Sequence, residues 1–182
     1  ELPAHTPGLS PQNVLVFGAG PLVGTLFPGG ARFNISAMSP QTGILGDANA
    51  GGFFGPELRF AGYDGIAITG RADVPVYLWI TESGVEIRDA RDLWGLDCYE
   101  TVERIRERTD PKARAIAIGP AGERMVSLAA IMVDGHEARA VGRGGMGGGG
   151  QRPRQQAQAR CRDDAPGSRA PQPGRGILFT RI

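Results

Sequence analysis

The sequence predicts an α+β fold built around a large sheet, with about seven strands and one clear helix. Short apolar or alternating segments recur along the chain, whereas only one segment shows the spacing of an amphipathic helix. Glycine and proline separate these segments, because the 182 residues include 29 Gly and 14 Pro. This glycine share is roughly twice the usual value of about 7%. Strands joined by tight turns therefore fit the pattern better than repeated strand–helix–strand units.

The first half of the chain predicts three strands. Residues 13–17 form a short apolar run that ends in a turn containing glycine and proline. Residues 31–38 alternate between polar and apolar side chains, which is typical of a half-buried strand. Residues 46–55 are rich in small side chains and predict a loop. A turn at 62–65 then leads into a short strand at 66–68.

The second half predicts a hairpin followed by two more strands. Residues 75–80 and 85–88 flank a Glu-Ser-Gly turn and have the pattern of a β-hairpin. Residues 113–118 and 126–133 are apolar runs separated by a Gly-Pro-Ala-Gly segment. The segments together give the strand count on which the α+β prediction depends.

One helix is predicted between the hairpin and the last strands. Asp97 and Glu100 have the spacing of a capping box, with Asp in place of Ser or Thr at the cap. Apolar side chains follow at helical spacing over residues 98–105. The helix is expected to end before Pro111, because proline disfavours the helical conformation in the residue that precedes it.

Two different kinds of sequence are joined near residue 147. Residues 1–147 carry 13 Lys and Arg against 17 Asp and Glu, a net charge of −4. Residues 148–182 carry 7 Arg against 2 Asp, a net charge of +5, and are rich in Arg, Gly, Pro and Gln. Such a segment buries too little apolar surface to offset its ordering entropy, so the sequence predicts a disordered tail after the folded domain.

Composition excludes several classes of protein. No run of 18 apolar residues is present, so no transmembrane helix is predicted. The N-terminus lacks the features of a signal peptide and an initiator Met, and we expect the chain to start inside a larger protein. Cys98 and Cys161 have no ligand spacing, which excludes a local disulfide framework and a self-contained zinc or iron–sulfur site.

A glycine-rich stretch after the first strand is a weak candidate for dinucleotide binding. Gly18, Gly20 and Gly24 are spaced one residue too widely for the fingerprint of a Rossmann fold. The following residues also stop any helix within two turns, so no helix N-terminus is available for a pyrophosphate. We therefore expect a tight turn here.

Two further stretches are candidates for anion binding. Arg32, Asn34 and Ser36 share one strand face next to the glycine-rich loop 46–52. Glycine permits close backbone approach to a ligand and arginine offers a bidentate fork for phosphate, although a solvent-exposed strand face is the alternative. Residues 138–147 place two Arg among glycines. They fit a phosphate cradle, a flexible linker or an RNA-binding segment comparably well.

Seven sequence blocks in a fixed order carry a resemblance to a known family. The blocks are residues 21–24, 32–34, 39–43, 49–65, 75–77, 118–123 and 139–147. Each is weak alone, but the ordered set, above all the stretch 49–65, is specific. Over roughly residues 8–147 the chain resembles the N-terminal domain of the tungsten-containing aldehyde ferredoxin oxidoreductase family.

The resemblance implies an α+β domain of two related β-sheet subdomains with few helices, followed by the disordered tail. Residues 1–147 would be the tungsten-bispterin-binding N-terminal domain, truncated at its start. The full-length enzyme would convert an aldehyde and water to a carboxylic acid. Its electrons would pass through tungstopterin and a [4Fe–4S] cluster to ferredoxin.

The resemblance also implies the residues that bind the cofactor. They are Arg32, Asn49, Gly51, Arg139, Ala140, Gly142, Arg143, Gly144 and Gly145. Arg32 and Arg139 would contact pterin phosphates, and the glycines would let the backbone approach the pterins. The backbone carbonyls of Asn49 and Ala140 would reach a magnesium ion that bridges the two phosphates. The metal would be tungsten or molybdenum, with its sulfur ligands supplied by the pterins.

Other parts of the family pattern lie outside this sequence. The resemblance assigns no catalytic residue to the fragment, and the downstream helical domains that hold the [4Fe–4S] ligands are missing. We therefore expect the fragment to be inactive alone. Ferredoxin and an aldehyde are the expected partners of the full-length enzyme, which would be cytoplasmic. Homo-oligomer formation is left open, and no membrane or nucleic-acid partner is expected.

The tail departs from the family pattern after residue 147. The loss of apolar pattern, with 7 Arg and no Lys, suggests translation in a shifted reading frame, which we state as a hypothesis. The alternative function is a non-enzymatic nucleic-acid-binding protein that uses the basic Arg/Gly tail. A salt-dependent interaction that requires residues 148–182 would distinguish this alternative.

Overall fold

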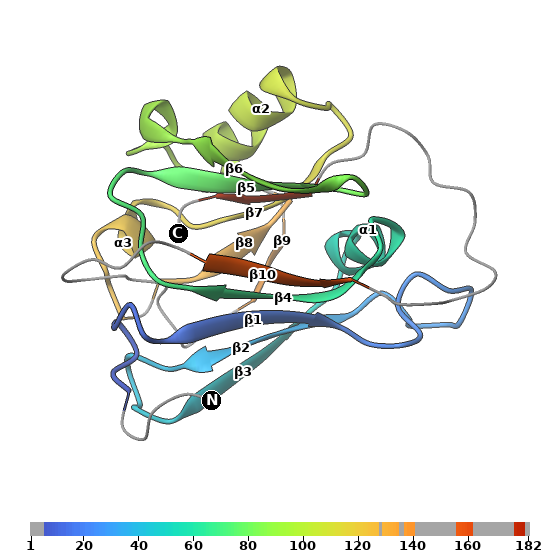
Figure 1. Ribbon diagram of the computed structural model, residues 1–182, viewed down its shortest axis with the longest axis horizontal. Coiled ribbons are helices and arrows are strands. Elements are labelled where there is room, and N and C mark those ends of the chain that lie inside the picture. The colour runs from blue at the N-terminus through green and yellow to red at the C-terminus, as the bar shows by residue number, and fades with distance from the viewer. Residues whose placement is uncertain (1–5, 128, 135–136, 141–155, 162–176, 181–182) are drawn as a thin grey trace.

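The structure consists of two β-sheets and a few helices (Figure 1). This computed structural model describes residues 6–127, 129–134, 137–140, 156–161 and 177–180. The two sheets lie one above the other, with the α1 helix (Phe54–Phe60) at one end between them. The α+β class with two sheets and few helices is thus confirmed.

Sheet A has five strands, and all their pairings are antiparallel. In spatial order the strands are β10 (Gln156–Cys161), β4 (Tyr63–Thr69), β1 (Val14–Ala19), β2 (Phe33–Met38) and β3 (Leu45–Ala50). Gly65 on β4 has to be glycine, because a Cβ there would lie 2.7 Å from the carbonyl oxygen of Phe17 on β1. β1 and β2 are antiparallel and are joined by residues 20–32, which form turns and no helix, so the helix that a Rossmann site needs does not follow β1.

Sheet B has six strands. In spatial order they are β6 (Gly84–Asp89), β5 (Val76–Thr81), β11 (Ile177–Thr180), β7 (Arg114–Ala117), β8 (Ile131–Val133) and β9 (Glu137–Ala140). β11 runs parallel to β7, and every other pairing is antiparallel. The hairpin predicted from residues 75–88 is confirmed as β5 and β6.

The core lies on both faces of sheet B. Between the two sheets, apolar side chains of both pack with α1, whose Phe54 and Leu58 are fully buried. On the outer face of sheet B, Trp79 and Ala115 pack beneath the α2 helix (Cys98–Arg108), which contributes Ile105. The layers are therefore sheet A, sheet B and α2, in the order that Figure 1 shows. The short α3 helix (Pro120–Glu123) and a 3₁₀ helix (Arg91–Leu93) complete the described elements.

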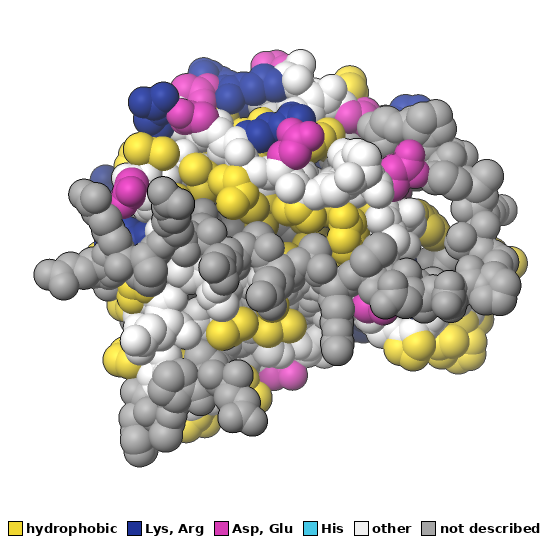
Figure 2. Space-filling view, viewed as in Figure 1, with side chains coloured by type: hydrophobic (Ala, Val, Ile, Leu, Met, Phe, Trp, Pro, Cys, Tyr) yellow, Lys and Arg dark blue, Asp and Glu magenta, His cyan; other side chains and the backbone are white. Residues whose placement is uncertain are grey.

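Charged side chains of both signs gather over α2 and β6 at the top of the molecule (Figure 2). Arg91 forms an ion pair with Asp89 at 2.7 Å, and Arg88 forms one with Glu86 at the same distance. The hydrogen bond from the Arg91 side chain holds the pKa of Asp89 below its usual value. Such exposed pairs contribute little to stability, so the fold depends on the apolar layers beneath them.

Three elements differ from the sequence-based expectation, and the strand expected over 126–133 is confined to β8 (Ile131–Val133). The stretch 46–55, expected to be a loop, instead supplies most of β3 and the start of α1. β3 forms because the β2 edge offers a full antiparallel ladder from Phe33 to Met38. α1 forms because Phe54 and Leu58 reach the core, although Gly55 and Pro56 give it no local helical signal.

The tail also differs from expectation at two places. Residues 156–161 form β10 on the outer edge of β4, and residues 177–180 form β11 inside sheet B. Both gain their order from backbone hydrogen bonds to strands that the folded domain presents. Disorder is therefore not the right description of these two segments, and residues 148–155, 162–176 and 181–182 lie outside the described residues.

The capping box at the start of α2 is confirmed. The Asp97 carboxylate accepts a hydrogen bond from the backbone N–H of Glu100 at 2.8 Å, and the Glu100 side chain accepts one from Asp97 N–H. We expect Asp97→Ala to lower the free energy of unfolding by about 1 kcal/mol, because a donor in the first turn loses its acceptor. Chemical denaturation would measure this, with Asp97→Ser as a control that keeps the cap. Equal losses for Ala and Ser would contradict the prediction.

None of the helices in the described part of the chain is both long enough and apolar enough to cross a membrane.

Candidate functional site

A polar face on the β2–β3 hairpin holds the first group of predicted site residues. Asn34 pairs with Asn49 across the two strands, and Ser36 pairs with Asp47. Because side chains alternate along a strand, these four share one face, and Phe33 and Ile35 on the other face are buried in the core. The strand register thus places these four polar side chains side by side on one surface of the two strands, which we call the hairpin face.

Hydrogen bonds fix part of the hairpin face. The Asn34 Nδ2 atom donates to Asp47 Oδ1 at 2.6 Å, and Ser36 Oγ donates to Asn34 Oδ1 at 2.6 Å. Asn34 is therefore held on both sides, with its amide orientation set by an acceptor and a donor. This network leaves one oxygen of Asp47 and the whole Asn49 side chain available on the same surface.

Arg32 and Asn49 offer unused polar groups beside this network. Arg32 lies directly before β2, Asn49 lies on β3, and both side chains are exposed. Within the described residues, neither side chain has a hydrogen-bond or ion-pair partner. A free guanidinium and a free amide on one face suit an anionic ligand that also carries hydrogen-bonding groups.

Gly51 lies at the end of β3 with open space above it. A Cβ added to Gly51 would meet no atom within 4 Å, so packing within the described residues does not require glycine there. Gly55 differs, because a Cβ there would lie 3.1 Å from the Phe33 Cβ atom. The open space fits the idea that Gly51 serves the approach of something other than the protein itself.

The second group of predicted residues lies on β9. Arg139 and Ala140 are the last two residues of this strand, and Ala140 pairs with Ile131 of β8. β9 contacts β3, the strand that carries Asn49, although the two strands belong to different sheets. The fold therefore brings both groups to the same region. Gly142, Arg143, Gly144 and Gly145 lie outside the described residues.

Metal ligands from acidic, His or Cys side chains are not gathered at this region. Across the part of the chain that the structure describes, no three such residues lie close enough to hold a metal ion. A hard cation bound here would need oxygen ligands from the backbone or from a cofactor. β3 is the edge strand of sheet A, so alternate backbone carbonyls along it point away from the sheet.

The comparison with known families decides the relationship. The family model described as "Aldehyde ferredoxin oxidoreductase, N-terminal domain" matches residues 1–149. The chain belongs to this family. The resemblance on which the sequence-based prediction rested is thus confirmed, and β10 and β11 lie beyond the residues that the family model matches.

Relatives of this aldehyde ferredoxin oxidoreductase domain are much longer proteins. A tungsten-containing aldehyde ferredoxin oxidoreductase of Pyrococcus furiosus is 51% identical over 140 residues, which are 76% of this chain and 23% of the relative. The WOR-like subunit of an aliphatic sulfonate oxidoreductase of the same organism is 40% identical over 153 residues, 76% of this chain and 24% of the relative. The chain thus spans about a quarter of the length of the curated relatives that it matches.

A solved structure has the same fold. The active-site complex BamBC of benzoyl coenzyme A reductase, in complex with 1,5-dienoyl-CoA, matches with a TM-score of 0.71 and 41% identity. The match covers 78% of this chain and 21% of that chain. None of these comparisons supports the nucleic-acid-binding alternative.

Sequence reasoning missed one residue of the family domain's hairpin face. Asp47 was not singled out, although it holds Asn34 and is the only acidic side chain of β3. The sequence did contain a signal for Asp47. Asp47 and Asn49 are two residues apart, so on a strand they share one face, and they lie opposite Ser36 and Asn34 once the strands pair. The register supplied the missing step.

Proposed function

We propose that this domain binds a tungsten bis-pterin cofactor on the hairpin face, as part of an enzyme that oxidises aldehydes to carboxylic acids. The observation that carries the proposal is the pair Arg32 and Asn49, whose side chains have no partner among the described residues, beside open space at Gly51. The proposal is also supported by a relative, a protein named as tungsten-containing aldehyde ferredoxin oxidoreductase, to which this chain is 51% identical.

The residues present fit such a cofactor. Arg32, with Arg139 and Arg143, would bind pterin phosphates through charge-assisted hydrogen bonds. The backbone carbonyls of Asn49 and Ala140 would serve as oxygen ligands of a magnesium ion that neutralises phosphate charge. Gly51, with Gly142, Gly144 and Gly145, would leave room for the pterin rings. The group supplies two-electron redox chemistry when bound.

Partners and location follow from the same proposal. Ferredoxin would accept the electrons after a [4Fe–4S] cluster whose ligands lie outside this chain, and the metal would be tungsten or molybdenum. The chain contributes no catalytic residue in this scheme. Its part is to bind and orient the cofactor, in a cytoplasmic enzyme whose remaining regions hold the cluster and the substrate.

A phosphorylated pterin tests the proposal without any enzyme assay. We expect Arg32→Gln to weaken the binding of a phosphorylated pterin about tenfold, because a charge-assisted hydrogen bond is lost. Binding of the same pterin without phosphate should be unchanged. Titration of the pterin fluorescence with the 182-residue chain measures both.

Arg71 provides the matched control. It is exposed in the turn after β4, at the end of sheet A opposite to Arg32, and has no partner among the described residues. Arg71→Gln removes the same charge and should leave both affinities unchanged. The proposal fails if Arg71→Gln and Arg32→Gln have equal effects, or if the wild-type chain does not prefer the phosphorylated ligand.

A further inference from the structure

A pocket of about 290 Å³ lies beside the start of β7. Three positively charged side chains, one acidic side chain and a proline line it, namely Arg106, Lys112, Arg114, Glu57 and Pro111. These residues come from α2, from the turn that leads into β7, from β7 itself and from α1. We call this space the basic pocket. None of the residues that line it belongs to the hairpin face.

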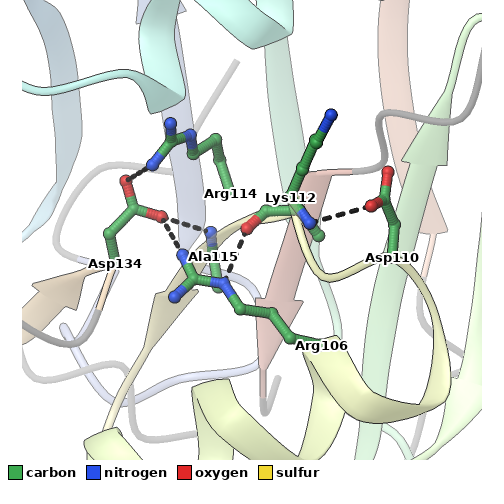
Figure 3. A network of polar contacts seen from close by, with 7 residues as sticks. Arg106, Asp110, Lys112, Arg114, Ala115 and Asp134 are labelled. Carbon is green, nitrogen blue, oxygen red and sulfur yellow. Dashed lines mark hydrogen bonds and ion pairs between the residues drawn. The ribbon is translucent and has the colours of Figure 1, made fainter.

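Lys112, the single lysine of the 182-residue sequence, offers an unused ammonium group to the basic pocket. Its backbone is held by Asp110, whose carboxylate accepts a hydrogen bond from the Lys112 N–H at 2.8 Å (Figure 3). The ammonium group itself has no hydrogen-bond or ion-pair partner among the described residues. Three N–H donors on one exposed side chain therefore remain for a ligand.

The Arg114 guanidinium is held in place, but its charge is only weakly balanced. It lies 4.4 Å from the centroid of the Phe53 ring, which orients it. Its ion-pair partner, Asp134, is 3.6 Å from Nη1, which is too far for a hydrogen bond, and its Nε atom is buried without a partner among the described residues. A cation only 31% exposed, with donors left over, favours a further anion nearby. In Figure 3 the Arg114 and Lys112 side chains extend to the same side.

The carboxylates at the basic pocket do not cancel its positive charge. Asp134 already accepts hydrogen bonds from Arg106 at 3.1 Å and from the backbone N–H of Ala115 at 3.0 Å. Glu57, the one acidic residue that lines the pocket, is buried on α1. Three lining cations thus face the two carboxylates of Asp134 and Glu57, which leaves one positive charge unbalanced. The pocket is therefore suited to an anion.

We propose that the basic pocket binds a phosphate group, either free phosphate or that of a small phosphate ester. The Lys112 ammonium and the Arg114 guanidinium donate charge-assisted hydrogen bonds to its oxygens, and Arg106 adds positive charge from α2. A tetrahedral phosphate suits cations that come from different elements, because its oxygens point in several directions, whereas those of a carboxylate lie in one plane. This inference does not depend on the proposed cofactor, whose phosphates are assigned to Arg32 and other residues outside this pocket.

The single lysine gives a direct test in the full 182-residue chain. An amine-reactive ester acylates Lys112, and peptide mass spectrometry separates this product from acylation of the N-terminal amine. We expect millimolar inorganic phosphate to slow the acylation of Lys112 about fivefold relative to chloride at equal ionic strength, because the bound anion occupies the ammonium group. The N-terminal amine is the internal control, and its rate should be the same in both salts.

Matched variants assign the binding to the basic pocket. Lys112→Gln changes an exposed residue and should weaken the binding of inorganic phosphate about tenfold in isothermal titration calorimetry, because a charge-assisted hydrogen bond is lost. Arg114→Lys keeps the charge but loses the planar guanidinium, so it should weaken binding by a smaller factor. Arg71→Gln removes an exposed charge elsewhere, and Arg32→Gln removes one beside the hairpin face. Both should leave the protection of Lys112 in the acylation test unchanged.

Glycerol phosphate, used beside inorganic phosphate, distinguishes the two sources of the ligand. Tighter binding of glycerol phosphate supports the proposal with a phosphate ester as the ligand, and tighter binding of inorganic phosphate supports it with the free ion. The proposal is overturned if neither compound protects Lys112, or if chloride protects it equally. It is also overturned if Lys112→Gln binds phosphate like the wild type, or if Arg71→Gln weakens binding as much as Lys112→Gln does. Loss of binding in Arg32→Gln alone would assign the phosphate to the hairpin face and overturn the proposal.

Discussion

Replacing Phe54 with alanine is expected to lower the free energy of unfolding by about 3–5 kcal/mol. Phe54 is fully buried on α1, with its ring centroid 4.9 Å from that of Phe33 and 6.3 Å from that of Phe17. These rings join α1 to β1 and β2, so the substitution leaves a cavity where three elements meet. Since whole domains are stable by only about 5–15 kcal/mol, this loss is a large share of the free energy of unfolding.

The neighbouring residue gives a matched control for this prediction. Phe53 is 61% exposed, and its described contact is with the Arg114 guanidinium, which lies 4.4 Å from the ring centroid. Phe53→Ala should therefore cost about 1 kcal/mol or less. Urea denaturation followed by circular dichroism measures both variants. Equal losses at the two positions would show that the core between the sheets does not depend on Phe54.

Asp134→Ala is expected to cost about 2–3 kcal/mol, because one carboxylate serves three donors (Figure 3). Asp134 accepts hydrogen bonds from Arg106 Nη2 at 3.1 Å and from the backbone N–H of Ala115 at 3.0 Å. It also lies 3.6 Å from Arg114 Nη1, and its side chain is only 14% exposed. Its removal leaves two half-buried guanidinium groups without this acceptor.

Two substitutions at the same position separate the causes. Asp134 has a φ of +54°, a left-handed conformation that asparagine tolerates better than alanine. Asp134→Asn keeps an acceptor for Ala115 and should lose less stability than Asp134→Ala. Asp134→Gly relieves the backbone strain but lacks the carboxylate, so its stability should lie between those of the Asn and Ala variants. Thermal melts of the three variants measure the order, and equal melting temperatures for Asn and Ala would contradict the role of the network.

The sequence predicted those elements whose structure is determined by residues close together in the chain. The hairpin of β5 and β6 was found because two β-branched and aromatic runs flank a glycine turn. The helix α2 was found because a capping box precedes an apolar helical repeat. In both cases the residues that determine the structure lie within a few positions of each other.

β3 and α1 could not be predicted in the same way. The residues of β3 are mostly small, with no alternation of apolar side chains, and the strand exists because β2 supplies a partner edge. α1 has seven residues, too few for stability by helix propensity, and is held by the burial of Phe54 and Leu58. Their structure depends on packing against elements that the local sequence does not contain.

The candidate site shows the same division. Arg32 and Asn49 were predicted from sequence, since their residue types and glycine-rich context match the family pattern. That Asn49 shares a face with Asn34 and Asp47 depends on the strand register. That β9, with Arg139 and Ala140, lies against β3 depends on the packing of one sheet on the other.

The sequence by itself determined the α+β class, the family of the domain and the residue types of the hairpin face. The tertiary structure alone decided that Asp134 joins Arg106 to Arg114, and that β11 lies between β5 and β7. The physical reason is the same in both cases. Short-range patterns encode turns, caps and strand faces, whereas contacts between distant segments form only when buried backbone and charged groups must find partners in the folded chain.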